Sequence, residues 1–370
     1  MKHRFKVATL AVLLSTGARA DSQSDALATI DAAMQDALQK NFGGVILIEQ
    51  KGKPIFEKSY GFADRENKIP FTPDTAAQIG SITKSMTAFA ILNLAHEGKI
   101  DIEKLVKTYL PGGASPAGAA TIHQILTHHA GLMDTCGDDF EPLSKADLLA
   151  KCMAKPLAHP AGEDHYSNMG YSILAAVVEQ VSSQSWEEYL RGHLWQPLGM
   201  SHTGFTQFAG ASATQVAYGY PPGKPRQDVI SSSLAKLKGD DWNLKGNGGI
   251  QSSVVDMERF YRGLNGTLPA IPRDVTSAIM SPHDHIDGEA WRGYGLAVRL
   301  DKNKKPYRIG FDGSDGTFEA YFGMLPQQDF FIYVVGNNGD ENVRPVISTS
   351  LKAAVKIAGI TPDMLQPAGK

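Results

Sequence analysis

Ser81 and Lys84 are three positions apart in the segment 80–84, which reads Gly-Ser-Ile-Thr-Lys. If a helix begins here, both side chains lie on one face and within reach of each other. A serine hydroxyl becomes a useful nucleophile only beside a base, and a lysine amine is a base only when it is held neutral. The helix dipole and burial in a cleft both lower the pKa of such a lysine. This S-x-x-K spacing therefore predicts acyl transfer from Ser81.

The same spacing also has a purely structural explanation. Ser81 is a good helix N-cap, and Lys84 would then be a solvated residue on the next turn. A second S-x-x-K, Ser233–Lys236, shows that the spacing alone is not specific. Features elsewhere in the chain have to distinguish the two explanations.

Tyr166-Ser167-Asn168 is the only Y-x-N segment in the chain. A phenol close to an ammonium group has a lowered pKa, so Tyr166 and Lys84 are predicted to share one proton and act as a coupled base. Asn168 would then hold a substrate amide or orient Lys84. The alternative is an asparagine helix cap beside an unrelated tyrosine.

The segment 309–314 reads Ile-Gly-Phe-Asp-Gly-Ser and is predicted to be the end of a strand. Glycine at such an end lets backbone N–H groups approach a ligand closely, which makes Gly313 and Ser314 candidate substrate contacts. The alternative is a strand that simply ends in a turn.

These segments together resemble the class C β-lactamase-related serine hydrolases, a family of penicillin-recognising enzymes, esterases and D-amino-acid peptidases. The agreement runs in order through nearly all of the chain after residue 20. The matching segments are Phe42–Val45, Gly80–Lys84, Leu126–Leu132, Tyr166–Tyr171, Pro197–Met200 and Gly248–Ser252.

The resemblance implies a role for each site residue. Ser81 would be the acylated nucleophile, Lys84 and Tyr166 its base system, and Asn168 a substrate contact. The oxyanion hole would be made by the backbone N–H groups of Ser81 and Ser314. The resemblance also implies a β-lactamase/transpeptidase-like fold.

One departure from the family pattern concerns substrate recognition. The third motif usually reads Lys-Thr-Gly or His-x-Gly, whereas positions 311–313 read Phe-Asp-Gly. A basic residue at the first position binds a substrate carboxylate or supports proton transfer, and Phe311 can do neither. We therefore expect acyl transfer to survive the change better than recognition of an acidic substrate. Arg299 and Arg308, on neighbouring predicted strands, are candidate replacements.

Several motifs for other chemistries are incomplete or missing. His283–Asp287 matches the first five positions of the H-x-H-x-D-H zinc motif, but Gly288 replaces the last histidine, and we predict a loop here. His96-Glu97 is followed by Ile100 where a zincin has its second histidine. The chain contains no G-x-S-x-G, Walker A or G-x-G-x-x-G segment. We therefore expect no metal and no cofactor.

Composition places the chain among ordinary globular proteins. It has 370 residues, 42% hydrophobic and 20% charged, which suits about two domains. The formal net charge is −3 and the isoelectric point about 6.4, so the chain has no basic surplus for nucleic acid.

The first 20 residues predict export. Lys2, Arg4 and Lys6 precede the apolar run 7–14, and the segment ends in Ala-Arg-Ala, as a cleavable signal peptide does. The run is too short for a stable membrane anchor. Cleavage after residue 20 removes these charges and Arg19, which changes the net charge from −3 to −7.

The only two cysteines, Cys136 and Cys152, are 16 positions apart. In an oxidising compartment they are expected to form one local disulfide, with two buried thiols as the alternative.

Periodicity predicts an α/β (α+β) fold in which an antiparallel sheet, flanked by N- and C-terminal helices, carries an inserted all-helical domain. We assign residues 1–20 to the signal peptide, 21–80 with 245–370 to the sheet domain, and 81–244 to the helical domain, with the active site at their interface. The predicted strands are 44–48, 54–60, 294–300, 307–311, 318–325 and 330–335. The predicted helices are 26–40, 82–96, 145–153, 169–181, 186–194, 254–264 and 346–358.

The sequence thus predicts an exported serine hydrolase that cleaves an ester or amide through an acyl-enzyme on Ser81. The substrate would be a small molecule or peptide-like, including D-amino-acid peptides and β-lactam-like compounds. The alternative is a binding protein that keeps the pocket but has lost turnover, which the phenylalanine at position 311 favours.

Overall fold

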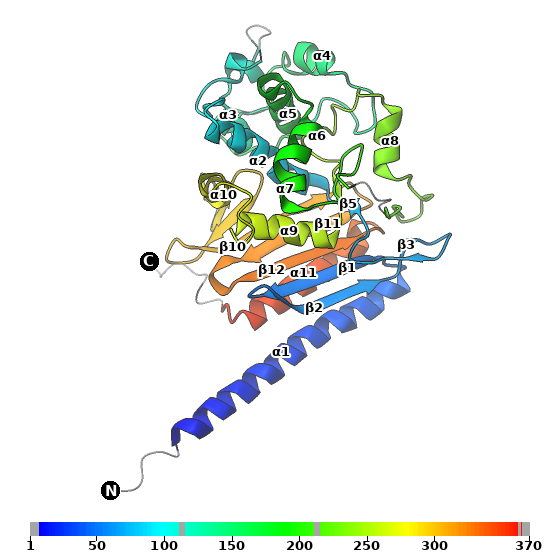
Figure 1. Cartoon of the computed structure of the whole chain (residues 1–370), viewed down its shortest axis with the longest axis vertical. Helices are drawn as coiled ribbons and strands as arrows, with labels where there is room; N and C mark the ends of the chain where they lie inside the picture. Colours follow the sequence, from blue (N-terminus) through cyan, green and yellow to red (C-terminus); the bar gives the residue numbers. More distant parts are fainter. Residues whose placement is uncertain (1–6, 111–114, 211–214, 362–363, 365–370) are drawn as a thin grey trace.

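An eight-stranded antiparallel sheet with helices on both faces forms the frame of the molecule (Figure 1). It is seen in a computed structural model that describes residues 7–110, 115–210, 215–361 and 364, with the backbone alone over 7–22. The mixed α/β class and the antiparallel sheet predicted from the sequence are confirmed. Of the predicted signal peptide, residues 1–6 lie outside the described residues, and no side chain of the rest is described.

The sheet joins the two ends of the chain. Its strand order is β2-β1-β12-β11-β10-β9-β8-β7, so the N-terminal hairpin pairs with the last strand through contacts such as Ile46 opposite Val334. The strands are β1 (Gly44–Gln50), β2 (Lys53–Tyr60), β7 (Asp284–Asp287), β8 (Ala290–Arg292), β9 (Ala297–Leu300), β10 (Pro306–Ser314), β11 (Glu319–Leu325) and β12 (Phe330–Gly336).

The central strands are covered on both sides. Every residue of β11 and β12 is buried, which explains why, apart from Glu319 at the start of β11, the sequence here does not alternate between apolar and polar residues. Helices α1 (Val7–Gln39) and α11 (Asp340–Ile357) pack together below the sheet in Figure 1. The helical part of the chain covers the opposite face.

The helical part is built around α2 (Thr83–His96), which is buried from Thr83 to Leu94. Helix α5 (Asn168–Ser182) packs against it, as does α10 (Arg273–Met280) on another side. The other helices are α3 (Ile122–Leu126), α4 (Lys145–Asp147), α6 (Trp186–Leu190), α7 (Gln196–Leu198), α8 (Ile230–Lys236) and α9 (Val254–Leu264). The short strands are β3 (Phe62–Asp64), β4 (Ile69–Pro70), β5 (Ala77–Gln78) and β6 (Gln251–Ser252). Single turns of 3₁₀ or π-helix are η1 (Gly80–Ile82), η2 (Val106–Thr108), η3 (Ala117–Ala119), η4 (Leu148–Cys152), η5 (Arg191–Trp195) and η6 (Pro326–Gln328).

Some predicted elements differ from the observed ones. The predicted loop over His283–Asp287 is wrong, because four of these residues form the edge strand β7, paired with β8. The strand predicted from Tyr294 begins only at Ala297, since Gly295 has a φ of +71°. The last helix begins at Asp340 instead of Val346, with acidic residues in its first turn, where they suit the helix dipole.

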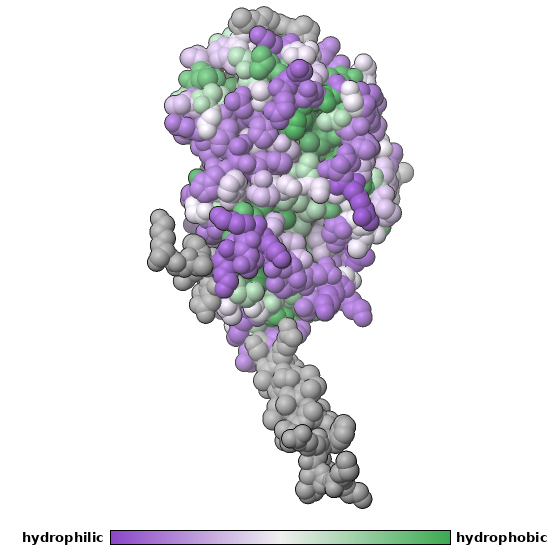
Figure 2. All heavy atoms as spheres, turned by 90° about the vertical axis from the view of Figure 1, so that its left-hand side faces the viewer, coloured by the Kyte–Doolittle hydropathy of each residue, from purple (hydrophilic) through white to green (hydrophobic). Residues whose placement is uncertain are grey.

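Hydrophilic side chains cover most of the face shown in Figure 2, and apolar side chains form separate patches between them. Over the described part of the chain, no helix combines the length and apolar character that a membrane span requires.

Candidate active site

Ser81 lies in the 3₁₀ turn η1 that leads directly into α2. Its Oγ is 3.0 Å from Lys84 Nζ and 2.6 Å from Tyr166 Oη. Neither Ser81 nor Asn168 caps a helix with its side chain, and Ser167 instead caps α5 through its bond to the Gly170 amide. The structural explanations based on capping therefore do not describe these two residues.

Lys84 is 0% exposed, yet its amine is fully hydrogen-bonded. Nζ lies 3.0 Å from Ser81 Oγ, 2.7 Å from Asn168 Oδ1 and 2.7 Å from the carbonyl oxygen of Asn247. Burial lowers the pKa of Lys84 to about 7, because the ammonium form loses its hydration. At neutral pH a substantial fraction of this lysine is a free base.

The partners of Lys84 determine what its neutral form can do. Asn168 Nδ2 donates to Asp134 Oδ1 at 2.9 Å, so Oδ1 of the same amide faces the amine. A neutral amine has two N–H donors and one lone pair. With the donors directed at Asn168 Oδ1 and the Asn247 carbonyl, the lone pair faces Ser81 Oγ. This arrangement suits proton removal from Ser81.

Tyr166 remains protonated in this environment. Burial, the strongest influence, raises the pKa of its phenol above the ordinary value, whereas the sequence led us to expect a lowered pKa. That expectation is wrong, because desolvation of the phenolate outweighs the nearby positive charges. Tyr166 Oη therefore acts as a hydrogen-bond donor to Ser81 Oγ.

Tyr166 is held between aromatic side chains. The His128 ring lies against it with centroids 4.5 Å apart, and the Phe311 ring is nearly parallel to it at 6.3 Å and 17°. His128 Nδ1 accepts a hydrogen bond from the Ser167 amide at 3.1 Å, which fixes the backbone beside Tyr166. Burial keeps the pKa of His128 well below its usual value, so the ring is neutral.

The end of β10 lies against the turn that carries Ser81. A Cβ atom on Gly80 would be 2.5 Å from the Ser314 amide nitrogen, and one on Gly313 would collide with the Ile79 carbonyl and lie 3.1 Å from the Ser81 amide nitrogen. Only glycines at both positions permit this approach. The backbone amides of Ser81 and Ser314 thereby lie on two segments that are in direct contact.

The candidate replacements for the missing basic residue do not contact the site. Arg299 is bonded to Glu289 at 2.9 Å, and its register partner Arg308 lines a groove against α11. The cation near the site is Arg292, whose guanidinium carbon is 6.0 Å from the Tyr166 ring centroid.

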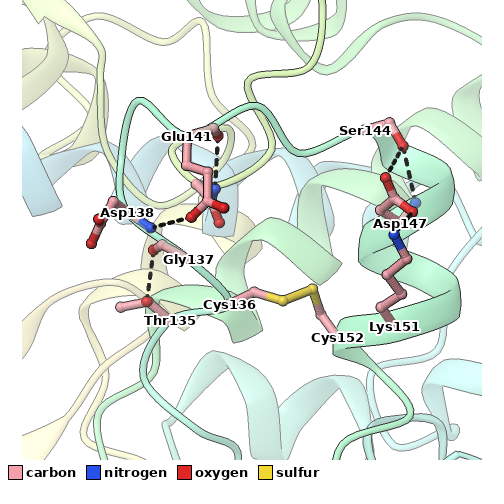
Figure 3. Close-up of a disulfide and its surroundings, with 10 residues drawn as sticks. Thr135, Cys136, Gly137, Asp138, Glu141, Ser144, Asp147, Lys151 and Cys152 are labelled. Carbon is pink, nitrogen blue, oxygen red and sulfur yellow. Dashed lines mark hydrogen bonds and ion pairs between the residues drawn. A yellow bond between two sulfur atoms is a disulfide. The ribbon is translucent and has the colours of Figure 1, made fainter.

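Cys136 and Cys152 form a disulfide with Cα atoms 5.8 Å apart (Figure 3). The bond ties the loop after Asp134 to the turn Leu148–Cys152. Since the carboxylates of Asp134 and Asp139 both favour the charged form of Lys84, this loop contributes to the electrostatics of the site.

The second S-x-x-K segment and the incomplete zinc motif do not form a further catalytic site among the described residues. Lys236 of the second S-x-x-K pairs with Asp228 at 3.0 Å on an exposed face of α8. His283 Nε2 is 2.7 Å from the Ala278 carbonyl. Among the described residues, no three His, Cys, Asp or Glu side chains are grouped as metal ligands.

Sequence reasoning missed Asn247, Asp134 and Arg292. Asn247 contributes a backbone carbonyl, for which residue type carries no signal. Asp134 lies two positions after the Leu126–Leu132 segment, so its position near a family motif was the one available indication.

The chain belongs to the Beta-lactamase family, whose sequence pattern matches residues 29–355. It is 26% identical over 346 residues to Protein flp of Staphylococcus aureus (strain COL), an alignment that covers 88% of this chain and 66% of the relative. The chain thus spans about two thirds of the length of that relative.

Solved structures share the fold. The octameric penicillin-binding protein homologue from Pyrococcus abyssi has a TM-score of 0.77 at 25% identity, with 92% of this chain and 79% of that chain covered. A class C beta-lactamase from Rhodobacter sphaeroides has a TM-score of 0.73 at 20% identity, covering 88% and 98%. The β-lactamase/transpeptidase-like fold implied by the sequence resemblance is confirmed, and the family and fold are those of serine-acylating hydrolases.

Proposed function

We propose that this protein is a serine hydrolase that cleaves an ester or amide through an acyl-enzyme on Ser81. The observation that carries the proposal is the pair of contacts to Ser81 Oγ, 3.0 Å from a buried lysine amine and 2.6 Å from a protonated phenol. The lysine has a pKa of about 7, close to the value at which a general base works best at neutral pH.

In the acylation step, the proton of Ser81 Oγ passes to the lone pair of Lys84 while Oγ bonds to the carbonyl carbon of the substrate. The electron pair of the carbonyl moves to its oxygen, which the Ser81 and Ser314 amides stabilise. When the tetrahedral intermediate collapses, the leaving group takes the proton of Tyr166, and the proton held by Lys84 restores the phenol.

In the deacylation step, a water molecule attacks the acyl carbonyl and loses a proton to the same groups. Ser81 Oγ then leaves the carbonyl carbon and regains a proton, which releases the acid and restores the free enzyme. Lys84 and Tyr166 thus serve both steps in opposite directions.

The proposed substrate is a small molecule or a short peptide-like compound. It carries no carboxylate that would have to be bound by a cation beside Tyr166. The Phe311 ring occupies that neighbourhood, and a phenylalanine offers no charge-assisted hydrogen bond. Neutral esters and amides fit this site better than acidic ones.

Export is part of the proposal. A disulfide between Cys136 and Cys152 suits an oxidising compartment. The test is the N-terminal residue of the protein recovered from the cells and the medium of the producing organism, with Asp21 expected if residues 1–20 are removed. Recovery of the uncut chain would contradict it.

The first experiment is intact-mass analysis and peptide mapping after exposure to a reactive fluorophosphonate, beside Ser81→Ala. A single adduct on the Ser81 peptide, absent from the variant, is expected. Near-full ester hydrolysis by Ser81→Ala would overturn the assignment of the nucleophile.

A second measurement separates an enzyme from a binding protein. Turnover of a simple nitrophenyl ester beyond one equivalent per Ser81 is expected. Release of one equivalent followed by a stable acyl adduct would favour the alternative of a protein that captures its ligand without turnover, which Phe311 motivates.

A further inference from the structure

Arg292 makes a bidentate ion pair near the active site. Its Nε and Nη2 donate to the two carboxylate oxygens of Asp164 at 2.6 and 3.0 Å, a bidentate geometry that fixes both side chains. The side chains are only 11% and 20% exposed, so solvent screens the pair weakly.

The pair connects two parts of the site that are distant in sequence. Arg292 is the last residue of β8, and Asp164 lies two positions before Tyr166. The pair therefore attaches the loop that carries the phenol to β8, the strand next to the edge strand β7. The guanidinium also lies 6.0 Å from the Tyr166 ring centroid, within reach of its face.

Arg292 contributes positive potential to each titrating group of the centre. It lowers the pKa of Lys84, Tyr166 and His128, opposing the acids of the neighbouring loop in the case of Lys84. The ionisable groups acting on this centre are Asp134, Asp139, His128, His129, Tyr166, Tyr171 and Arg292. Lys84 therefore responds to the carboxylates of Asp134 and Asp139 and to a guanidinium that is itself paired with Asp164.

We propose that Arg292, held in place by Asp164, is a positioning and charge-setting residue whose guanidinium supplies, from strand β8, the positive charge that Phe311 lacks in the third motif. The guanidinium is already held by a carboxylate, so it acts on the proton-transfer groups and not as a binding site for substrate anions. This inference rests on the proposed function, since its effect on catalysis is read through turnover at Ser81.

The test follows the titration of Lys84 by ¹³C NMR of lysine-labelled protein, with the resonance assigned by its absence in Lys84→Met. Arg292→Met removes the positive charge and leaves Asp164 unpaired, so the midpoint should rise. Asp164→Asn breaks the same attachment but leaves the guanidinium unneutralised, so the midpoint should fall. Arg292→Lys should stay closer to the original protein than Arg292→Met.

The two single variants disturb the loop in the same way and the charge in opposite ways. A purely structural role would therefore change both in the same direction, or change neither, and would overturn the inference. Arg299→Met is the matched control, because it breaks an ion pair on the neighbouring strand β9 that does not contact the site. It should leave the midpoint and the turnover unchanged.

Ester turnover tests the inference independently of the NMR titration. In an active enzyme, the acid limb of the kcat/KM profile should move with the NMR midpoint in each variant. If the original protein does not hydrolyse esters, the proposed function fails, while the NMR midpoints still test the pair. If it does hydrolyse them and the midpoints of both variants coincide with the original, only the present inference fails.

Discussion

The active site has two sides that differ in how closely they follow the family pattern. We call the turn η1 with helices α2 and α5 the helix side, and strand β10 the strand side. On the helix side, Ser81 and Lys84 have polar partners at hydrogen-bond distance, and the residues involved match the family pattern. On the strand side, β10 keeps its backbone close to the nucleophile but has Phe311 where the family has a basic residue. In the proposed mechanism, the groups that break the bond and the position that selects the substrate therefore lie on different elements of the fold.

Lys84→Met should cause the largest loss, because it removes the base from the helix side. We expect ester turnover to fall by about 10²- to 10⁴-fold, the range typical of a lost general base. The measurement is kcat/KM for a neutral ester.

Lys236→Met is the matched control, since it alters the lysine of the other S-x-x-K segment, which is exposed and pairs with Asp228. It should retain full activity. Equal losses in the two variants would show that the lysine of the buried site has no special role.

Gly313→Ala should break the strand side without changing any catalytic side chain. The new Cβ would collide with the Ile79 carbonyl, so β10 must move away from the Ser81 amide. Loss of one oxyanion donor costs about 10²- to 10³-fold in kcat. Gly192→Ala, at a helical position with open space, is the control and should leave kcat unchanged. An unchanged kcat in Gly313→Ala would show that the backbone of β10 does not stabilise the oxyanion.

The pH dependence should report the titration of Lys84, on the helix side. The pKa of Lys84 is lowered to about 7, so the neutral, active amine dominates above that pH and the inactive ammonium below it. We expect kcat/KM to rise about tenfold per pH unit below pH 7 and then to level off. If the acid limb of the kcat/KM profile has the same midpoint in Phe311→Leu, the titrating group lies on the helix side. A limb near pH 10 would show that burial does not shift this lysine.

Phe311→Lys should have the smallest effect, a change in the preference between a carboxylate-bearing ester and its neutral analogue. Restoring a cation beside Tyr166 is expected to raise kcat/KM for a carboxylate-bearing ester by about tenfold relative to its neutral analogue, through one charge-assisted hydrogen bond. The measurement is the ratio of the two rates. Phe62→Lys, at an exposed aromatic of β3, is the control. An unchanged ratio in Phe311→Lys would mean that selection depends on another part of the cleft.

The sequence was most informative where structure is local. The spacing of Ser81 and Lys84 determines their proximity, because a helical turn brings residues three apart together. The apolar run of β12 identified a central strand to within one residue at its end. By contrast, the polar edge strand β7 was mistaken for a loop, since a short exposed strand has little apolar pattern.

Contacts across the fold had no comparable signal. Asn247 reaches Lys84 across 163 positions with a backbone carbonyl, and Arg292 reaches Asp164 across 128 positions. Neither pairing leaves a periodicity or a spacing in the sequence. The raised pKa of Tyr166 was missed for the same reason, because burial depends on the completed tertiary structure.

The Asn247 carbonyl that binds Lys84 also limits how early in protein synthesis the site can be complete. The nucleophile and its lysine are made early in synthesis, but their acceptor at position 247 and the amide at position 314 are made much later. A nascent polypeptide that ends before residue 247 therefore lacks the acceptor of Lys84. The proposed chemistry at Ser81 therefore depends on the complete tertiary structure and not on the local segment that carries the nucleophile.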